Sequence, residues 1–178
     1  MKQKFRFDPI LLLRTWAPKL VTLTLDVHSL STVNEQTIRD HWQCIASMQS
    51  SLKSLHLLNF FKSPAPEHVA TLSQLEQFTL VEDRPQLENP TYIGLGRVLS
   101  QLGPSLRVLR LNHEPPEDVP ELQLLESAVQ RLASNVIQLT LSSEESYELG
   151  AFVGKFHQLT HLDLSPLGSF SVRIRSIH

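Results

Sequence analysis

Residues 106–111 read Leu-Arg-Val-Leu-Arg-Leu, and the spacing of the three leucines in this stretch decides the fold. The pattern L-x-x-L-x-L, with conservative replacements, occurs at five other places in the chain. Its six copies begin at Leu20, Leu52, Leu75, Leu106, Val136 and Leu159. Successive copies begin 32, 23, 31, 30 and 23 residues apart. The last two apolar positions of each copy are separated by one residue, which predicts a short strand with one buried face.

Leucine is in excess over the other aliphatic residues. The chain has 178 residues, of which 32 are leucine, whereas valine and isoleucine together contribute 19. A buried parallel sheet ordinarily favours the β-branched residues. The leucine excess therefore indicates a packing slot that is repeated along the chain, in agreement with the recurring pattern.

Four segments between the expected strands place apolar residues at helical spacing, namely residues 34–48, 91–102, 120–133 and 146–156. The shorter units leave room for only a turn or two of helix, as in residues 67–72. Strand, loop and helix in regular succession predict an α/β solenoid of about six repeats, with a parallel β-sheet on the concave side and helices on the convex side.

We expect a single domain over residues 1–178. Residues 1–19 would form an N-terminal cap for the first repeat, and residues 165–178 an irregular C-terminal end. Within that end, apolar residues partly alternate with polar ones, which favours one more strand rather than a capping helix. The apolar residues are Phe170, Val172, Ile174 and Ile177, and the polar ones are Ser171, Arg173 and Arg175.

Composition excludes several classes of protein. The net charge of −2 and the pI of about 6.4 provide no field that would draw the chain onto nucleic acid or an anionic membrane. No apolar run approaches the roughly 18 residues that span a bilayer. The single cysteine, Cys44, rules out a disulfide framework and favours a small buried thiol in a reducing compartment. We therefore expect a cytoplasmic or nuclear protein.

The six copies of the pattern resemble those of the leucine-rich-repeat family, from about Leu20 to Leu167. The long, uneven repeats are similar to those of F-box ubiquitin-ligase substrate receptors or to ribonuclease-inhibitor-type repeats. The sequence departs from the family pattern at the third position after the last leucine of each copy. The family carries asparagine or cysteine there. That position holds His28, Phe60, Asp83, Glu114, Glu144 and Leu167.

The resemblance implies a protein–protein recognition module without catalysis or cofactor. Its most specific form is substrate recognition in an F-box-type ubiquitin ligase, with ubiquitin-ligase components as partners if the full-length protein has an F-box. The alternative is a regulatory or scaffold leucine-rich-repeat protein unconnected to ubiquitination. The recognition module would bind its partner on the concave face of the sheet, whereas the regulatory or scaffold protein would bind through acidic loops at one edge of the solenoid.

Strand residues that alternate with the buried leucines should be exposed on that concave face. The pattern aligns them across the six copies in rows, and from two of these rows we select six candidate partner-binding residues. The candidates are His56, Thr79, Arg110, Gln138, His161 and Asp163. Arginine is a favoured anchor in protein interfaces.

A second candidate surface is acidic. Residues 63–148 carry thirteen acidic and five basic groups, and most of the acidic groups follow strands, among them Glu82, Glu114, Glu121 and Glu144. They could form an acidic rim that steers a basic partner. Alternatively, they serve as favourable charges at the N-termini of the following helices.

The motifs of common enzyme sites are absent from the sequence. Gly94-Leu95-Gly96 lacks the third glycine of a dinucleotide-binding loop and should weaken or bend a helix instead. His157 and His161 have a spacing that could bind zinc on a helix, but they are expected to fall on either side of a helix end. We therefore predict neither an active site nor a metal site.

Overall fold

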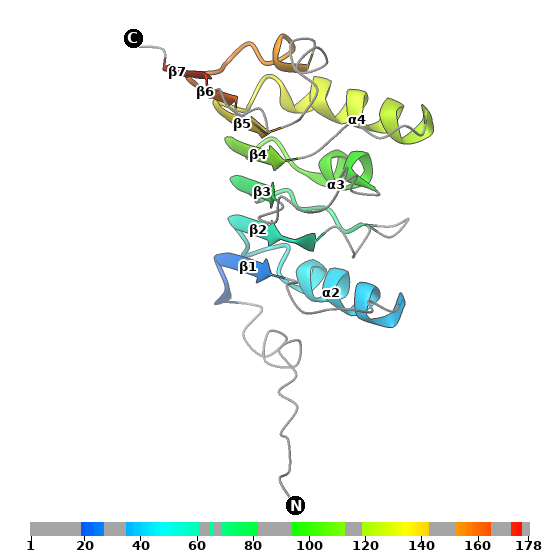
Figure 1. Ribbon diagram of the computed structural model, residues 1–178. Helices are drawn as coiled ribbons and strands as arrows, with labels where there is room; N and C mark the ends of the chain where they lie inside the picture. The colour runs from blue at the N-terminus through cyan, green and yellow to red at the C-terminus, as the bar shows by residue number, and fades with distance from the viewer. Residues whose placement is uncertain are drawn as a thin grey trace, which may run out of the picture.

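A computed structural model describes residues 19–26, 35–60, 65, 69–81, 94–112, 119–142, 152–164 and 172–175. These residues form one sheet and three helices (Figure 1). The strands are β1 (Thr22–Asp26), β2 (Ser54–Leu58), β3 (Gln77–Val81), β4 (Val108–Asn112), β5 (Gln138–Ser142), β6 (His161–Leu164) and β7 (Val172–Arg175). The helices are α2 (Glu35–Ser47), α3 (Leu95–Gln101) and α4 (Val119–Leu132).

The strands lie side by side in the order in which the chain forms them. The first six are parallel, and β7 runs antiparallel to β6. The register aligns the second apolar position of every copy of the sequence pattern across the sheet. These aligned residues are Leu23, Leu55, Phe78, Leu109, Leu139 and Leu162. The structure thus confirms the α/β class and the parallel sheet that the leucine pattern predicts.

The same backbone link joins every pair of successive parallel strands. The carbonyl that immediately precedes a strand accepts hydrogen bonds from two consecutive N–H groups at the start of the next strand. For example, the Lys53 carbonyl accepts from Glu76 at 2.8 Å and from Gln77 at 3.0 Å. The corresponding carbonyls of the other copies belong to Val21, Glu76, Arg107 and Ile137. The link is therefore a property of the repeated unit, although the segments between the strands differ in length.

The core lies between the sheet and the helices, which all cover the same face of the sheet (Figure 1). Leu55 and Leu109 of the strands are fully buried, as are Met48 after α2 and Leu99 of α3. The Cys44 thiol is buried within this core, as expected. Because a strand places successive side chains on opposite faces, the residues between the core leucines point away from the helices.

Two of the expected helices have nearly the predicted bounds, and a third begins later. α2 and α4 agree with the predicted segments 34–48 and 120–133 to within one residue at each end. α3 begins only at Leu95, because Gly94 adopts a left-handed conformation with φ of 92°. A left-handed residue cannot continue a right-handed helix, so Gly94 marks the boundary of α3.

The short helical turn predicted for residues 67–72 is wrong where the structure describes it. Residues 69–71 are not helical, and Leu72 forms an isolated parallel bridge with Leu102 instead. The bridge fixes this segment in an extended conformation against the next unit. Of the predicted helix over 146–156, the described part is helical only at residues 152–153.

Both chain ends fall largely outside the described residues. The expected N-terminal cap, residues 1–19, is described only at Lys19. At the other end, β7 provides the additional strand that the alternating residues predict.

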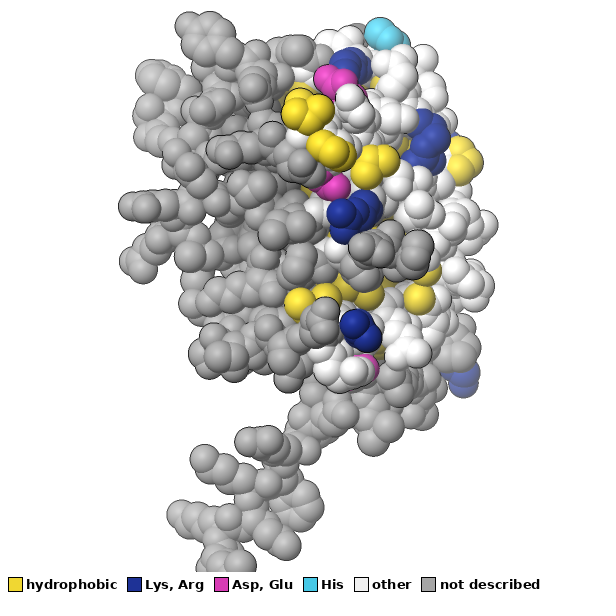
Figure 2. All heavy atoms as spheres, turned by 90° about the vertical axis from the view of Figure 1, so that its right-hand side faces the viewer, with side chains coloured by type: hydrophobic (Ala, Val, Ile, Leu, Met, Phe, Trp, Pro, Cys, Tyr) yellow, Lys and Arg dark blue, Asp and Glu magenta, His cyan; other side chains and the backbone are white. Residues whose placement is uncertain are grey.

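The helix side of the molecule carries some exposed hydrophobic side chains. Figure 2 views this side and shows apolar side chains in contact with one another at the surface. On α4, the exposed fractions are 62% for Val119, 36% for Leu122 and 41% for Leu124. Within the residues described, no helix is both long and apolar enough to cross a membrane.

Candidate binding face

The face of the sheet opposite α2, α3 and α4 is the candidate binding face, and we call it the open face. The register arranges its central row across six strands. In order from β1 to β6, this row consists of Thr24, His56, Thr79, Arg110, Thr140 and Asp163. A neighbouring row, one position before the core leucines, contains Ser54, Gln77, Gln138 and His161 among its members. The structure therefore brings all six candidates onto one face.

His56 is the centre of a hydrogen-bond network on the open face. Its Nε2 lies 2.8 Å from Ser54 Oγ, and its Nδ1 lies 3.0 Å from Thr79 Oγ1. Ser54 Oγ in turn donates to Gln77 Oε1 at 3.2 Å. Since a hydroxyl has one proton, Ser54 accepts from Nε2–H of His56. Nδ1 of His56 then accepts from the Thr79 hydroxyl, and the network is complete with a neutral imidazole.

The electrostatic surroundings of His56 favour the same neutral form. Burial lowers the pKa of His56 from its ordinary value of 6.5, and the positive charge of Arg110 lowers it further. The two effects act in the same direction because desolvation and a nearby cation both disfavour the imidazolium. His56 is therefore neutral at pH 7, in agreement with the hydrogen-bond directions.

Arg110 is the exposed cation of the central row. It lies on β4, between Thr79 of β3 and Thr140 of β5 in the register. Its side chain is exposed and makes no hydrogen bond or ion pair within the described part of the chain. The hydroxyl of Thr140 likewise makes no hydrogen bond there. A cation held by strand geometry but left unpaired is suited to contact an anionic group of another molecule.

The prediction that all candidate residues are exposed is wrong for Thr79. Its side chain is only 6% exposed, because it lies between His56 and Arg110 and is hydrogen-bonded to His56. Gln138 and Asp163 are half-buried, whereas His161 is exposed and has its Nδ1 2.9 Å from Thr160 Oγ1.

Ser54 is a member of the network that the sequence pattern did not single out. It is 7% exposed and sits two residues before His56 on the same face of β2. The spacing S-x-H within a strand was the signal that could have found it. The distance to His56 resembles that of a nucleophile and its base, but the Ser54 proton is directed to Gln77 and the oxygen is buried. The arrangement serves to orient His56 and Thr79.

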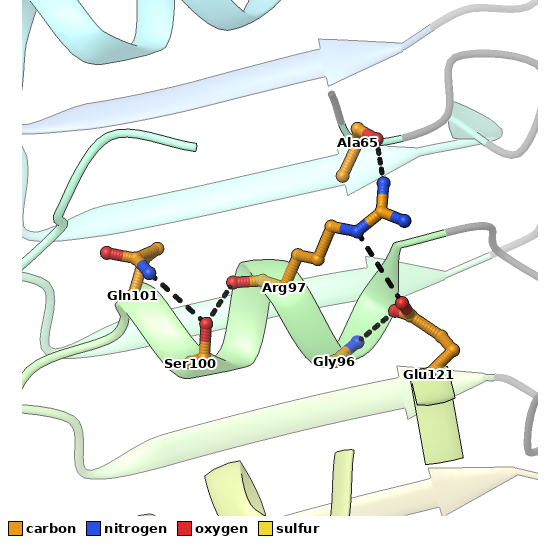
Figure 3. A network of polar contacts seen from close by, with 6 residues as sticks. All are labelled: Ala65, Gly96, Arg97, Ser100, Gln101 and Glu121. Atoms are coloured by element: carbon orange, nitrogen blue, oxygen red, sulfur yellow. Dashed lines mark hydrogen bonds and ion pairs between the residues drawn. The ribbon is translucent and has the colours of Figure 1, made fainter. Parts of the chain in front are cut away.

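One residue predicted for the acidic rim, Glu121, does not lie on the surface. Glu121 lies in the first turn of α4, not in a loop, and its side chain is buried. As Figure 3 shows, Glu121 Oε1 accepts a hydrogen bond of 2.9 Å from the backbone N–H of Gly96. Its Oε2 lies 3.6 Å from Nε of Arg97. The other acidic residues proposed for the rim, including Glu82, Glu114 and Glu144, lie outside the described residues.

Gly96 permits the close approach of α3 and α4. A Cβ atom at this position would lie 2.7 Å from the Leu125 nitrogen and 2.9 Å from the Glu121 carbonyl oxygen. The Gly94-Leu95-Gly96 sequence therefore does more than weaken a helix: Gly94 caps the N-terminus of α3, and Gly96 lets α4 pack directly against it.

His157 and His161 have the spacing of a possible zinc pair, but no third ligand lies with them among the described residues. In that part of the chain, no group of three His, Cys, Asp or Glu side chains could hold a metal ion. His157 lies in a turn and His161 begins β6, so the two occupy different elements.

Comparisons with models of protein families, with curated proteins and with solved structures find no match to this chain. The open face and its network are therefore the basis on which a function can be proposed.

Proposed function

We propose that the chain is a leucine-rich-repeat solenoid that binds a protein partner on its open face and performs no catalysis. Two observations on the fold support the repeat assignment. The same two-hydrogen-bond link joins each pair of parallel strands, and the apolar positions of successive copies occupy the same register. Units joined in this way bury their hydrophobic faces against their neighbours, which is the stabilising principle of a solenoid.

The observation that carries the binding role is the exposed Arg110 at the middle of the sheet, which makes no hydrogen bond or ion pair among the described residues. The helices α2, α3 and α4 occupy the other face of the sheet (Figure 1), and the Arg110 side chain is exposed. Arginine contributes strongly to protein interfaces because its guanidinium combines charge, planarity and apolar surface. Hydrogen bonds hold the side chains of His56 and Thr79, which lie in the same row as Arg110. Side chains that are already ordered lose less conformational entropy when a partner binds.

A specific form of the proposal is substrate recognition in an F-box-type ubiquitin ligase. It is supported by the resemblance of the uneven repeat lengths and places the protein in the cytoplasm or nucleus. The test is purification of the natural full-length gene product, with assay for a cullin-adaptor protein in the complex. An adaptor that copurifies supports the ligase role, whereas its absence favours a regulatory or scaffold protein that uses the same face.

The binding role itself is tested with one substitution on each side of the sheet. The purified chain is used as bait in a matched cell lysate beside the variants Arg110→Gln and Arg39→Gln. Arg39 is an exposed arginine on α2, so its substitution removes the same charge from the helix side. Circular dichroism first verifies that both variants are folded.

We expect a captured protein that is lost with Arg110→Gln and retained with Arg39→Gln. Capture that survives Arg110→Gln but not Arg39→Gln would contradict binding on the open face.

A further inference from the structure

We infer that Arg110 receives a single aspartate or glutamate side chain from an extended segment of the protein partner, and that protonation of His56 strengthens this contact. The inference rests on the proposed function and adds to it the chemistry of the partner and a dependence on pH. It follows from the geometry around Arg110, from the charges that share its face, and from the hydrogen-bond directions at His56.

The geometry suits a carboxylate. The Arg110 guanidinium is exposed and without a hydrogen-bond partner in the described residues, so its donors are available for the bidentate contact that a carboxylate makes. The Thr140 hydroxyl, next to Arg110 in the register, is also without a partner there. It can donate a further hydrogen bond to the same anion.

Two carboxylates, one toward each edge of the sheet, lie on the open face away from Arg110. Asp26 is the last residue of β1, and Asn59 Nδ2 donates a hydrogen bond of 2.8 Å to its Oδ1. Asp163 lies on β6, two strands beyond Arg110 in the central row. The net charge of −2 provides no field that favours a polyanion such as nucleic acid, which carries a charge at every phosphate. An extended peptide with one acidic residue at its centre meets only the cation.

His56 is close enough to respond to the ligand. It lies two strands from Arg110 in the same row, so their Cα atoms are about 10 Å apart, and the charge of Arg110 already affects its protonation. The other charged groups on the elements that flank His56 are Asp26 on β1 and the pair Lys53–Glu76, 3.2 Å apart, at the starts of β2 and β3. Each of these carboxylates already has a partner.

The direction of the pH dependence follows from linkage. In the free protein, burial and Arg110 lower the pKa of His56 and keep its imidazole neutral. A bound carboxylate offsets the charge of Arg110 and therefore raises the pKa of His56. If binding favours the protonated form, protonation must favour binding to the same extent. Acidification through the pH range in which His56 titrates therefore increases the affinity for the acidic peptide.

The hydrogen-bond network explains how protonation reaches the ligand. In the neutral state the Thr79 hydroxyl donates to Nδ1 of His56. Once Nδ1 carries a proton it donates to Thr79 Oγ1, so the Thr79 proton becomes free to point elsewhere. Thr79 is the β3 neighbour of Arg110 in the register, so this hydroxyl can turn toward a carboxylate held by Arg110.

The experiment is selection of random linear peptides by display on the native chain and on Arg110→Gln, with Arg39→Gln as the control. We expect peptides selected by the native chain and by Arg39→Gln to share one Asp or Glu, and this preference to vanish with Arg110→Gln. Replacement of the shared Glu by Gln in a selected peptide should weaken binding by about tenfold or more.

Affinity for the same peptide should rise several-fold between about pH 7 and about pH 5, and the rise should disappear in a folded His56→Gln variant. A second readout needs no ligand: Arg110→Gln should raise the pKa of His56, measured by NMR titration of its ring protons.

The outcomes separate this inference from the proposed function. Peptides that depend on Arg110 but show no preference for an acidic residue would overturn the inference and leave open-face binding intact. Affinity for an acidic peptide that is unchanged by pH, with an unchanged pKa of His56 in Arg110→Gln, would overturn the role of His56. A native chain that selects no peptide would overturn the inference, whereas the proposed function fails only if capture of the protein partner does not depend on Arg110.

Discussion

Glu121 and Arg131, both on α4, bind opposite ends of the neighbouring helix α3. Glu121 accepts a hydrogen bond from the Gly96 N–H in the first turn of α3. Arg131 donates to the carbonyl oxygens of Leu99 and Ser100 in the last turn, at 2.9 Å and 2.7 Å. A negative charge near the N-terminus of a helix and a positive charge near its C-terminus both interact favourably with the helix dipole. α3 has seven residues, too few for stability in isolation, so these contacts contribute to its formation.

Glu121→Gln should destabilise the protein by about 1–3 kcal/mol, because a buried charge-assisted hydrogen bond is weakened and Arg97 loses its ion-pair partner. The free energy of unfolding, measured by urea denaturation, tests this. The matched control is Glu126→Gln, an exposed glutamate on the same helix, which should change the stability by less than about 0.5 kcal/mol. Equal effects of the two substitutions would show that α4 does not hold α3 through Glu121.

Gly96→Ala should separate α3 from α4 and cost about 1–3 kcal/mol, since the added Cβ meets backbone atoms that cannot move independently. Ser127→Ala, at an exposed position of α4, serves as the control for a small change in side-chain volume. Thermal unfolding monitored by circular dichroism compares the two variants. An unchanged melting temperature for Gly96→Ala would mean that the two helices pack less closely than described here.

Phe60 lies three residues after the last leucine of its copy of the pattern, Leu57. Its side chain is fully buried and meets Trp42 edge to face, with ring centroids 6.0 Å apart. Phe60→Asn, which replaces the aromatic ring with a smaller polar group, should therefore destabilise the protein by at least about 3 kcal/mol, because an aromatic side chain is lost from the core. Phe60→Leu, which keeps most of the apolar volume, should cost less. Stabilisation by Phe60→Asn in urea denaturation would contradict this packing role.

Stability should decrease on acidification below neutral pH. Burial lowers the pKa values of His41 and His56 from 6.5 in the folded protein. The unfolded chain then binds more protons than the folded chain as the pH falls through 6.5 toward the folded pKa values, so the free energy of unfolding falls with it. Denaturant titrations at a series of pH values measure the slope, and His56→Gln should remove part of it. An unaltered slope in both His56→Gln and His41→Gln would assign the effect to other groups.

The strands and their alignment could be predicted from the sequence because they depend on local order. Each copy of the pattern places leucines at period two, and burial of those leucines against the helices fixes the register. Arg110 and His56 were therefore assigned to one row from residue spacing alone. Thr79 was assigned to the correct row, but its burial depends on the side chains in the adjacent strands, which spacing does not reveal.

The contacts between α3 and α4 could not be predicted in the same way. Glu121 and Gly96 are 25 residues apart in sequence, and no periodic pattern links them. An acidic residue near the start of a helix usually favours its own N-terminus, whereas Glu121 binds the N-terminal turn of the neighbouring helix. The extended path of residues 69–71 depends similarly on a partner, Leu102, in the next unit.

The central claim is that a partner contacts the open face, and site-specific photocrosslinking tests it most directly. A photoreactive amino acid replaces Thr140, beside Arg110 on the open face, or Gln130, an exposed residue of α4 on the helix side. Each variant is irradiated with the protein that the native chain captures and Arg110→Gln does not. Our account predicts a crosslink from position 140 and none from position 130. A crosslink from position 130 alone would place the partner on the helices and contradict it.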